Sequence, residues 1–131
     1  MTNIFNLKII TPEKTIFADE INMAMIPSYE GDMSILKDHI SIITFLRPGI
    51  IKTNNSKESS KSFFVTDGIV EFSENNLVIL STSAINAKEL KKDYINSIEK
   101  DSYEKLKQQD LSDEERYILN YKIDTIKTLN L

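Results

Sequence analysis

The chain has 131 residues, of which 40% are hydrophobic, so one compact domain with a real core, or such a domain with a small appendage, is expected. It contains no cysteine and a single histidine, His39, which excludes disulfide frameworks, thiol nucleophiles and two-histidine metal motifs. The formal net charge of −4 disfavours a nucleic-acid module, because binding phosphates requires a basic surface. No apolar run approaches the roughly 20 residues that span a bilayer. We therefore expect a soluble cytosolic chain that meets a membrane only through a partner.

The first 84 residues show the two-residue hydrophobic period of β-strands. Apolar residues alternate with polar or small ones in two segments, through Phe5, Leu7 and Ile9 and through Ile21, Met23 and Met25. Further β-branched or aromatic runs follow at 40–45, 50–53, 62–66, 69–72 and 77–80. Turn-forming residues separate these runs, and the polar stretch 54–60 predicts a solvated hairpin tip. Many short strands at close spacing predict an antiparallel β-sandwich or barrel over residues 1–84, and we take the sandwich as the expected fold.

Beyond residue 84 the hydrophobic period becomes helical. Asn86, followed three residues later by Glu89, predicts the N-cap of a helix of about five turns. One face of this first helix carries Leu90, Tyr94 and Ile98, which we expect to pack within a hairpin.

A second helix is predicted by the capping box of Ser112 and Glu115. Its packing face carries Leu119, Ile123 and Ile126. Because the connection 107–111 is short, residues 85–131 are predicted to form an antiparallel two-helix hairpin. Such a hairpin has little core of its own, which makes it a candidate for a mobile regulatory appendage.

Motifs that carry catalysis or nucleotide binding are missing from the sequence: it has no P-loop, no G-x-G-x-x-G, no G-x-S-x-G and no H-E-x-x-H. The densest polar cluster holds Glu30, Asp32 and His39, and three interpretations stay open for it. It is an enzyme site, a solvated turn between strands or a partner-facing loop. A free-standing β-sandwich module that binds a ligand or peptide is a further alternative.

Four segments, one of them in two parts, taken together resemble the epsilon subunit family of the bacterial F-type ATP synthase, the counterpart of the mitochondrial delta subunit. Residues 30–39 and 47–51 are similar to that family's S-E-G-E-x-G-I-x-P-G-H-A-P and K-P-G-x-[IV] motifs. Residues 63–72 resemble F-x-x-x-G-G-[IVF]-[LV]-E-V, residues 77–84 resemble V-T-V-L-A-D-x-A, and residues 7–13 match L-x-[IV]-V-[ST]-P-E. The motifs occur in the family's order, and the resemblance covers essentially the whole chain, since the predicted helical hairpin falls where the family has one.

The resemblance implies a non-catalytic rotor subunit, peripheral on the cytoplasmic face of the bacterial inner membrane, without catalytic, metal or cofactor-binding residues. Its implied partners are the gamma subunit, the membrane c-ring and, through the hairpin, the catalytic beta subunits. By motif position, the c-ring-facing loop comprises Glu30, Gly31 and Asp32. The gamma-facing residues, likewise by motif position, are His39, Ile42 and Thr44.

Three departures from the family pattern lead to further expectations. Lys37-Asp38 replaces the usual Pro-Gly before the histidine, so this loop is expected to turn less sharply. Residues 90–95 lack the Asp and Arg of ATP-binding members, so we expect weak or no nucleotide binding. Segment 113–131 has three basic residues against four acidic ones, so the strongly basic face of inhibitory members is missing and weak inhibition of ATP hydrolysis is expected.

Overall fold

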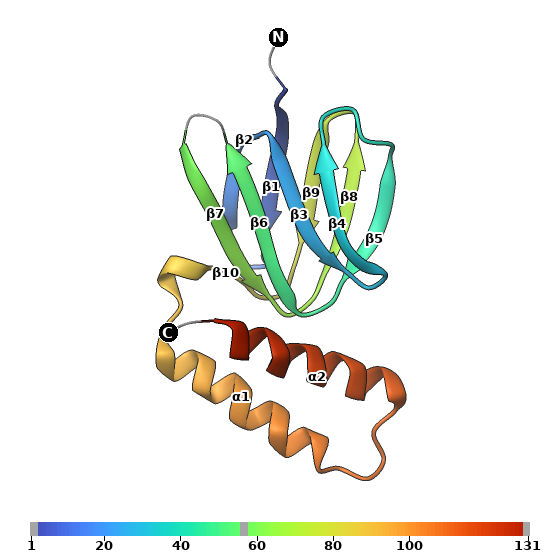
Figure 1. Ribbon diagram of the computed structural model, residues 1–131, viewed down its shortest axis with the longest axis vertical. Helices are drawn as coiled ribbons and strands as arrows, with labels where there is room; N and C mark the ends of the chain where they lie inside the picture. Colours follow the sequence, from blue (N-terminus) through green and yellow to red (C-terminus); the bar gives the residue numbers. More distant parts are fainter. Residues whose placement is uncertain (1–2, 56–57, 130–131) are drawn as a thin grey trace. The chain divides into compact units, whose positions relative to one another are not determined.

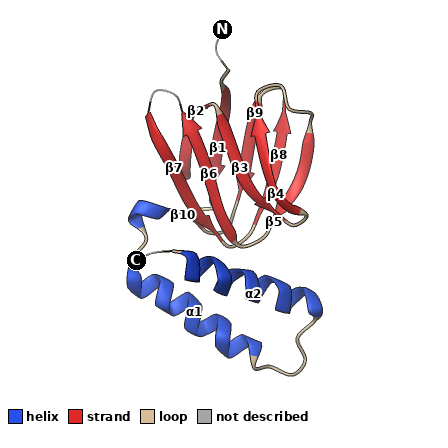
Figure 2. Ribbon diagram, in the orientation of Figure 1, coloured by secondary structure: helices blue, strands red, loops and turns tan. Residues whose placement is uncertain are grey.

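The structure, a computed structural model, describes residues 3–55 and 58–129 (Figure 1). It divides into two compact units, Met1–Lys88 and Glu89–Leu131. The first unit carries the strands and the second carries the two α-helices (Figure 2). Strand β10, Ala84–Asn86, pairs with β7, so the sheet extends two residues beyond the predicted limit at residue 84. Part of the predicted hairpin tip, Ser56 and Lys57, lies outside the described residues.

Ten strands in the described ranges form one hydrogen-bonded sheet, in the order β10-β7-β6-β3-β5-β8-β9-β1-β2, with β4 paired to β3. Their bounds are β1 Phe5–Ile10, β2 Thr15–Ile21, β3 Met23–Ser28, β4 Gly31–Leu36, β5 Ile42–Leu46, β6 Gly49–Asn55, β7 Glu58–Val65, β8 Gly68–Ser73, β9 Asn76–Leu80 and β10 Ala84–Asn86. A single pair of described residues, Ser28 and Leu46, joins β3 to β5, so the sheet divides there into two layers. The predicted antiparallel sandwich is confirmed, with one exception: β1 and β9 run parallel.

The core lies between the two layers and is built from alternating inward side chains. In β1, Phe5, Leu7 and Ile9 are buried as predicted, while the residues between them are exposed. The Phe5 ring meets the Phe72 ring edge-on at 5.6 Å between centroids. Close packing of this kind makes the sandwich stiff, because protein interiors have low compressibility.

The predicted alternation around residue 23 is wrong. Ala24 and Ile26 are fully buried, whereas Met23 and Met25 are only partly buried. The strand ends at Ile21, and a new strand begins after Asn22, whose N–H donates to the carbonyl of Asn54 at 2.8 Å. This break restarts the alternation, and a shift of one residue exchanges the two faces of a strand.

The first helix begins later than predicted. Asn86 accepts a hydrogen bond from the N–H of Lys88 at 3.0 Å and so caps only the 3₁₀ turn Ala87–Glu89. The α-helix α1, Lys92–Leu106, starts without a side-chain cap. Its buried residues are Ile95 and Ser102, while Tyr94 is 36% exposed and Ile98 is partly buried. The prediction that Tyr94 lies on the packing face is therefore wrong, and Leu90, although buried, precedes the helix.

The second helix, α2, Asp113–Thr128, begins as predicted and packs against α1. Ser112 Oγ accepts from the N–H of Glu115 at 3.1 Å, and Glu115 Oε1 accepts from the N–H of Ser112 at 3.4 Å. Its buried residues include the three that the periodicity predicted, Leu119, Ile123 and Ile126. The capping box is a strictly local device, and this explains why the sequence was sufficient to find it.

Replacing Ser112 by alanine is expected to destabilise the hairpin by about 1 kcal/mol, because the N–H of Glu115 loses its side-chain acceptor. Thermal unfolding followed by the helical circular dichroism signal measures the change. The control is Ser97→Ala, at an exposed position within α1 that caps nothing. Equal stability of the two variants would contradict the role of the cap.

Candidate interaction surfaces

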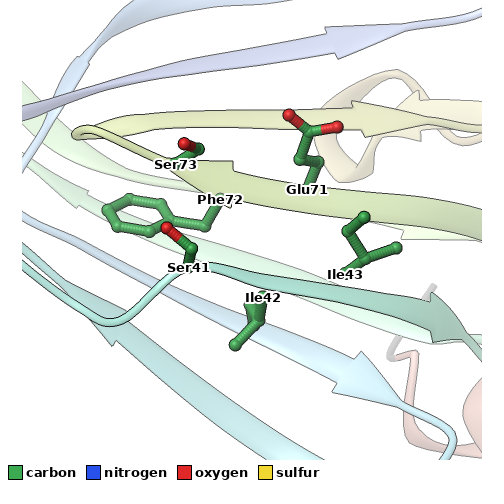
Figure 3. A pocket seen from close by; sticks show the side chains of 6 residues that line it. All are labelled: Ser41, Ile42, Ile43, Glu71, Phe72 and Ser73. Atoms are coloured by element: carbon green, nitrogen blue, oxygen red, sulfur yellow. The ribbon is translucent and has the colours of Figure 1, made fainter.

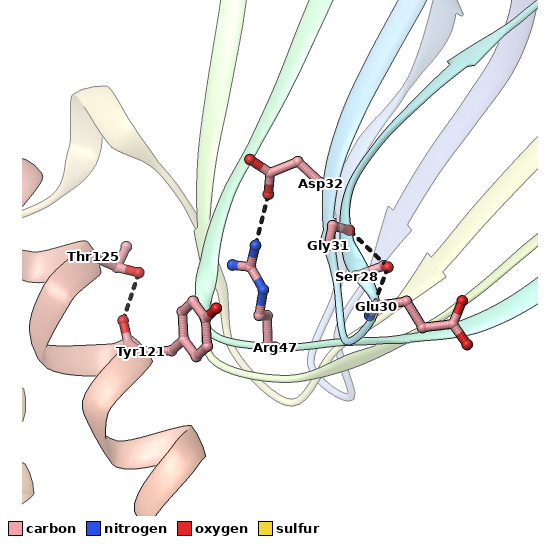
Figure 4. Close-up of polar contacts among 7 residues, drawn as sticks. All are labelled: Ser28, Glu30, Gly31, Asp32, Arg47, Tyr121 and Thr125. Atoms are coloured by element: carbon pink, nitrogen blue, oxygen red, sulfur yellow. Dashed lines mark hydrogen bonds and ion pairs between the residues drawn. The ribbon is translucent and has the colours of Figure 1, made fainter.

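The β3–β4 turn forms one end of the sandwich (Figure 4). Ser28 Oγ donates to the carbonyl of Gly31 at 2.8 Å and accepts from the N–H of Glu30 at 3.2 Å. Gly31 has a φ of 128°, which other residues rarely adopt. Gly31 and Asp32 already belong to strand β4, so only Glu30 of the predicted loop lies at the tip, with its side chain exposed.

Asp32 is joined to a neighbouring strand end by an ion pair. Its Oδ1 lies 2.8 Å from Nη2 of Arg47, whose side chain is 13% exposed against 65% for Asp32. An ion pair with one partner this exposed contributes little to stability. The carboxylates of Glu30 and Asp32 are both exposed, and the ion pair partly balances the charge of Asp32 (Figure 4).

His39 lies at the opposite end of the sandwich, in the connection from β4 to β5. The turn that precedes it is closed by the N–H of His39, which donates to the carbonyl of Leu36 at 3.1 Å. Asp38 has a φ of 66°, the left-handed conformation that a type II turn requires at this position. The expectation of a less sharply turned loop is therefore wrong, because Asp38 adopts the conformation for which the family uses glycine.

The structure separates the residues of the predicted polar cluster. The backbone of β5 runs from the His39 end to Leu46, which pairs with Ser28 beside the Glu30 turn (Figure 1). At about 3.3 Å per residue this distance is roughly 20 Å. Side chains that far apart cannot share a proton-transfer step, so the enzyme interpretation of Glu30, Asp32 and His39 is not supported. Within residues 3–55 and 58–129, no three His, Asp or Glu side chains are grouped closely enough to hold a metal ion.

Strand β5 directs apolar side chains to both of its faces. Ile42 and Thr44 are partly buried, and Ile42 packs against the core. Ile43 and Phe45 alternate with them and are 72% and 58% exposed. Motif position missed these two residues, although the sequence carries a signal for them: 42–46 is nearly continuously apolar, which is typical of a strand covered on both faces.

The outward side chains continue across three strands and form what we call the apolar face: Ile43, Phe45, Ile69 and Leu80. Phe45 pairs with Ile69 on β8, and Ile69 pairs with Leu80 on β9, so the three side chains form one row. Ile69 is 46% and Leu80 is 48% exposed. Contiguous exposed apolar side chains mark interaction sites, whereas scattered ones do not.

An open depression of about 430 Å³ adjoins the apolar face, between β5 and β8 (Figure 3). It is lined by Ser41, Ile42, Ile43, Glu71, Phe72 and Ser73. Figure 3 shows Glu71 and Ile43 directed to the same side of the strands. The depression extends the apolar face toward the His39 turn, and Glu71 places a carboxylate at the border of that face.

A β-sandwich with an exposed apolar strip, followed by a two-helix hairpin, has the features of a protein that docks on a partner. None of the helices in the described part of the chain has the length and apolar character needed to cross a membrane. Residues 4–87 match the family model of the ATP synthase delta/epsilon chain β-sandwich domain. The chain belongs to this family.

Relatives and solved structures agree with this assignment. The chain is 44% identical over 131 residues to the ATP synthase epsilon chain of Pelagibacter ubique, covering 99% of this chain and all of the relative. It is 33% identical over 81 residues to that of Parvibaculum lavamentivorans, covering 62% of this chain and 61% of the relative. A chain of the Euglena gracilis mitochondrial ATP synthase shares the fold, with a TM-score of 0.74, 15% identity and coverage of 98% and 81%. As an epsilon-type chain, the protein is a non-catalytic subunit.

Proposed function

We propose that this chain is a rotor subunit of an F-type ATP synthase and couples rotation of the c-ring to the gamma subunit. The observation that carries the proposal is the similarity to an epsilon chain along its entire length. A structural neighbour from Tetrahymena thermophila belongs to the central stalk and c-ring of a mitochondrial ATP synthase; it has a TM-score of 0.63 at 20% identity, with coverage of 95% of this chain and 92% of that one. Transmitting torque requires a stiff body with broad interfaces, and the filled sandwich supplies the stiffness.

The gamma-facing surface in this proposal combines His39 with the apolar face. Ile42 and Thr44, the other two residues predicted there, lie on the inner side of the same strand and support the surface from below. Interfaces gain most of their energy from a few large side chains that become fully desolvated. Phe45 and Ile69, adjacent in the row, are the side chains best suited to this role.

The c-ring-facing surface is the turn around Glu30, at the opposite end of the sandwich from His39. The row of Phe45, Ile69 and Leu80 lies on the outer face of the strands toward the Glu30 end, because the neighbouring Leu46 pairs with Ser28. Two separate interfaces on a stiff body suit a part that transmits rotation from one partner to the other. In this arrangement the chain lies peripherally on the cytoplasmic face of the bacterial inner membrane and is held there by the complex.

Purification from detergent-solubilised membranes tests the proposal. A tagged chain is expected to recover the gamma subunit and the c-ring in fixed stoichiometry. A free-standing ligand- or peptide-binding module would be recovered without these two partners, and that result would contradict the rotor assignment.

Reversing the charge at Glu30 and Asp32 together, by Glu30→Lys and Asp32→Lys, is expected to reduce ion pumping per ATP hydrolysed about two- to fivefold. The reason is that the charges at the rim of the c-ring interface would no longer be complementary. Glu30→Lys alone should produce most of this effect, because Asp32 is already paired with Arg47. Pumping and hydrolysis are measured together in inverted membrane vesicles. The control is Glu20→Lys, an exposed acidic position on β2, and unchanged coupling in the double variant would remove the c-ring assignment.

Deleting the chain from Ala87 onward is expected to raise membrane ATPase activity less than about twofold, since an ion-pair-driven inhibition needs a basic face and segment 113–131 has a net charge of −1. The catalytic beta subunits are the proposed partners of the hairpin. Membrane ATPase activity is compared between wild-type and truncated complexes with equal gamma content. A large rise in hydrolysis would show that the hairpin is a strong inhibitor.

A further inference from the structure

Two turns at the His39 end of the sandwich are tied together by reciprocal side-chain hydrogen bonds. The N–H of Asp38 donates to Oδ1 of Asn75 at 2.7 Å, and Nδ2 of Asn75 donates to Oδ1 of Asp38 at 2.9 Å. Both residues are left-handed, with φ values of 66° and 61°. Asn and Asp tolerate this conformation better than other residues with a side chain, because they form local hydrogen bonds. We call this pair the Asp38–Asn75 clamp.

The backbone of Asn75 is anchored to strand β1 of the sheet. Asn75 lies in the two-residue turn between β8 and β9. Its carbonyl accepts a hydrogen bond at 3.0 Å from the N–H of Asn6, a residue of β1, the strand that pairs with β9. Its main chain is thus fixed to the sheet while its side chain holds the neighbouring turn. The same hairpin supplies a second support, since the ring of Phe72 meets the ring of His39 edge-on at 5.8 Å.

We propose that Asn75 is a positioning residue for gamma binding: through Asp38 it orders the turn that presents His39 and Ile40 next to the depression lined by Ser41 and Ile43, at the end of the apolar face. Ile40 is 76% exposed, and it precedes the outward Ile43 by three residues. A turn that is ordered before association loses less conformational entropy on binding, and a larger fraction of molecules is ready to bind. This inference rests on the proposed function, because the gamma subunit is the partner that it assumes.

Two matched pairs of variants test the role of Asn75. Asn75→Gly keeps a residue that tolerates the left-handed conformation and removes the amide; Glu74→Gly makes the same change at the adjacent left-handed position, where φ is 49°, and leaves the clamp intact. Asn75→Asp places two carboxylates against each other. Adding Asp38→Asn to it restores an amide–carboxylate pair with the charge of the wild type.

Amide hydrogen exchange on the free chain and the affinity for the isolated gamma subunit are measured without denaturant, at a temperature where every variant is folded. Asn75→Gly and Asn75→Asp are expected to lose protection at the Asp38 amide and to bind gamma roughly three- to tenfold more weakly, the scale of one or two hydrogen bonds. Glu74→Gly and the double variant should bind within about twofold of wild type on the same scale.

Equal gamma affinities for Asn75→Gly and Glu74→Gly would overturn the positioning role, as would a double variant that binds no better than Asn75→Asp. A wild-type chain that does not bind gamma would overturn the proposed function, and the positioning role with it. The two failures are distinct, because the first leaves wild-type binding intact.

Discussion

Replacing Phe45 and Ile69 together by threonine is expected to weaken binding to the gamma subunit on the order of 100-fold, the scale of two truncated interface anchors. The two side chains are direct partners across β5 and β8, and Ile69 is the central member of the apolar row. Threonine keeps the preference of these positions for strand structure. Both side chains are largely outside the core, so the free energy of unfolding should change by less than about 1 kcal/mol. Calorimetric titration of the isolated gamma subunit measures the affinity.

The control for this variant is Tyr103→Gln, which removes an aromatic side chain that is 41% exposed but belongs to α1, in the helical unit of the chain. Its gamma affinity should match the wild type. If the Phe45 and Ile69 variant keeps full affinity, the apolar face is not the gamma-facing surface and another surface of the sandwich must serve.

Replacing Ile79 by alanine is expected to lower the free energy of unfolding by about 2–5 kcal/mol, because it leaves a cavity that the surrounding side chains fill only in part. Ile79 is fully buried on β9, between β8 and β1. Urea unfolding followed by circular dichroism at a strand wavelength measures this change. An effect of this size is a large fraction of the stability of a small domain.

The matched control is the next residue, Leu80→Ala. Leu80 is 48% exposed and points away from the core, so its loss should change the free energy of unfolding by less than about 1 kcal/mol. Equal losses from the two variants would contradict the division of β9 into a core face and an apolar face.

The parts of the fold that were predicted correctly depend on residues close together in the chain. The alternation in β1 follows from Phe5, Leu7 and Ile9 alone, and the start of α2 follows from Ser112 and Glu115. The start of α1 was missed because Asn86 forms its hydrogen bond within a 3₁₀ turn instead of a helix. That choice between two local structures was not encoded in the capping pattern.

The candidate surfaces were harder to predict than the fold. Family motifs pointed to Glu30 and His39, but they gave no indication that β5 separates them by its full length. The same motifs selected Ile42 and Thr44, whereas the most exposed side chains of the strand are Ile43 and Phe45. Which face of an apolar strand meets the core depends on the second layer, and residues distant in sequence form that layer.

The sequence by itself determined the class of the protein: a cysteine-free chain with one histidine, two hydrophobic periods and four family motifs in order. These are local or additive properties, so they can be read without knowing which residues meet in space. Only the tertiary structure decided that Phe45, Ile69 and Leu80 form one exposed row and that Asn75 holds Asp38 across 37 residues. Both depend on strand register, and register is settled by packing between distant segments.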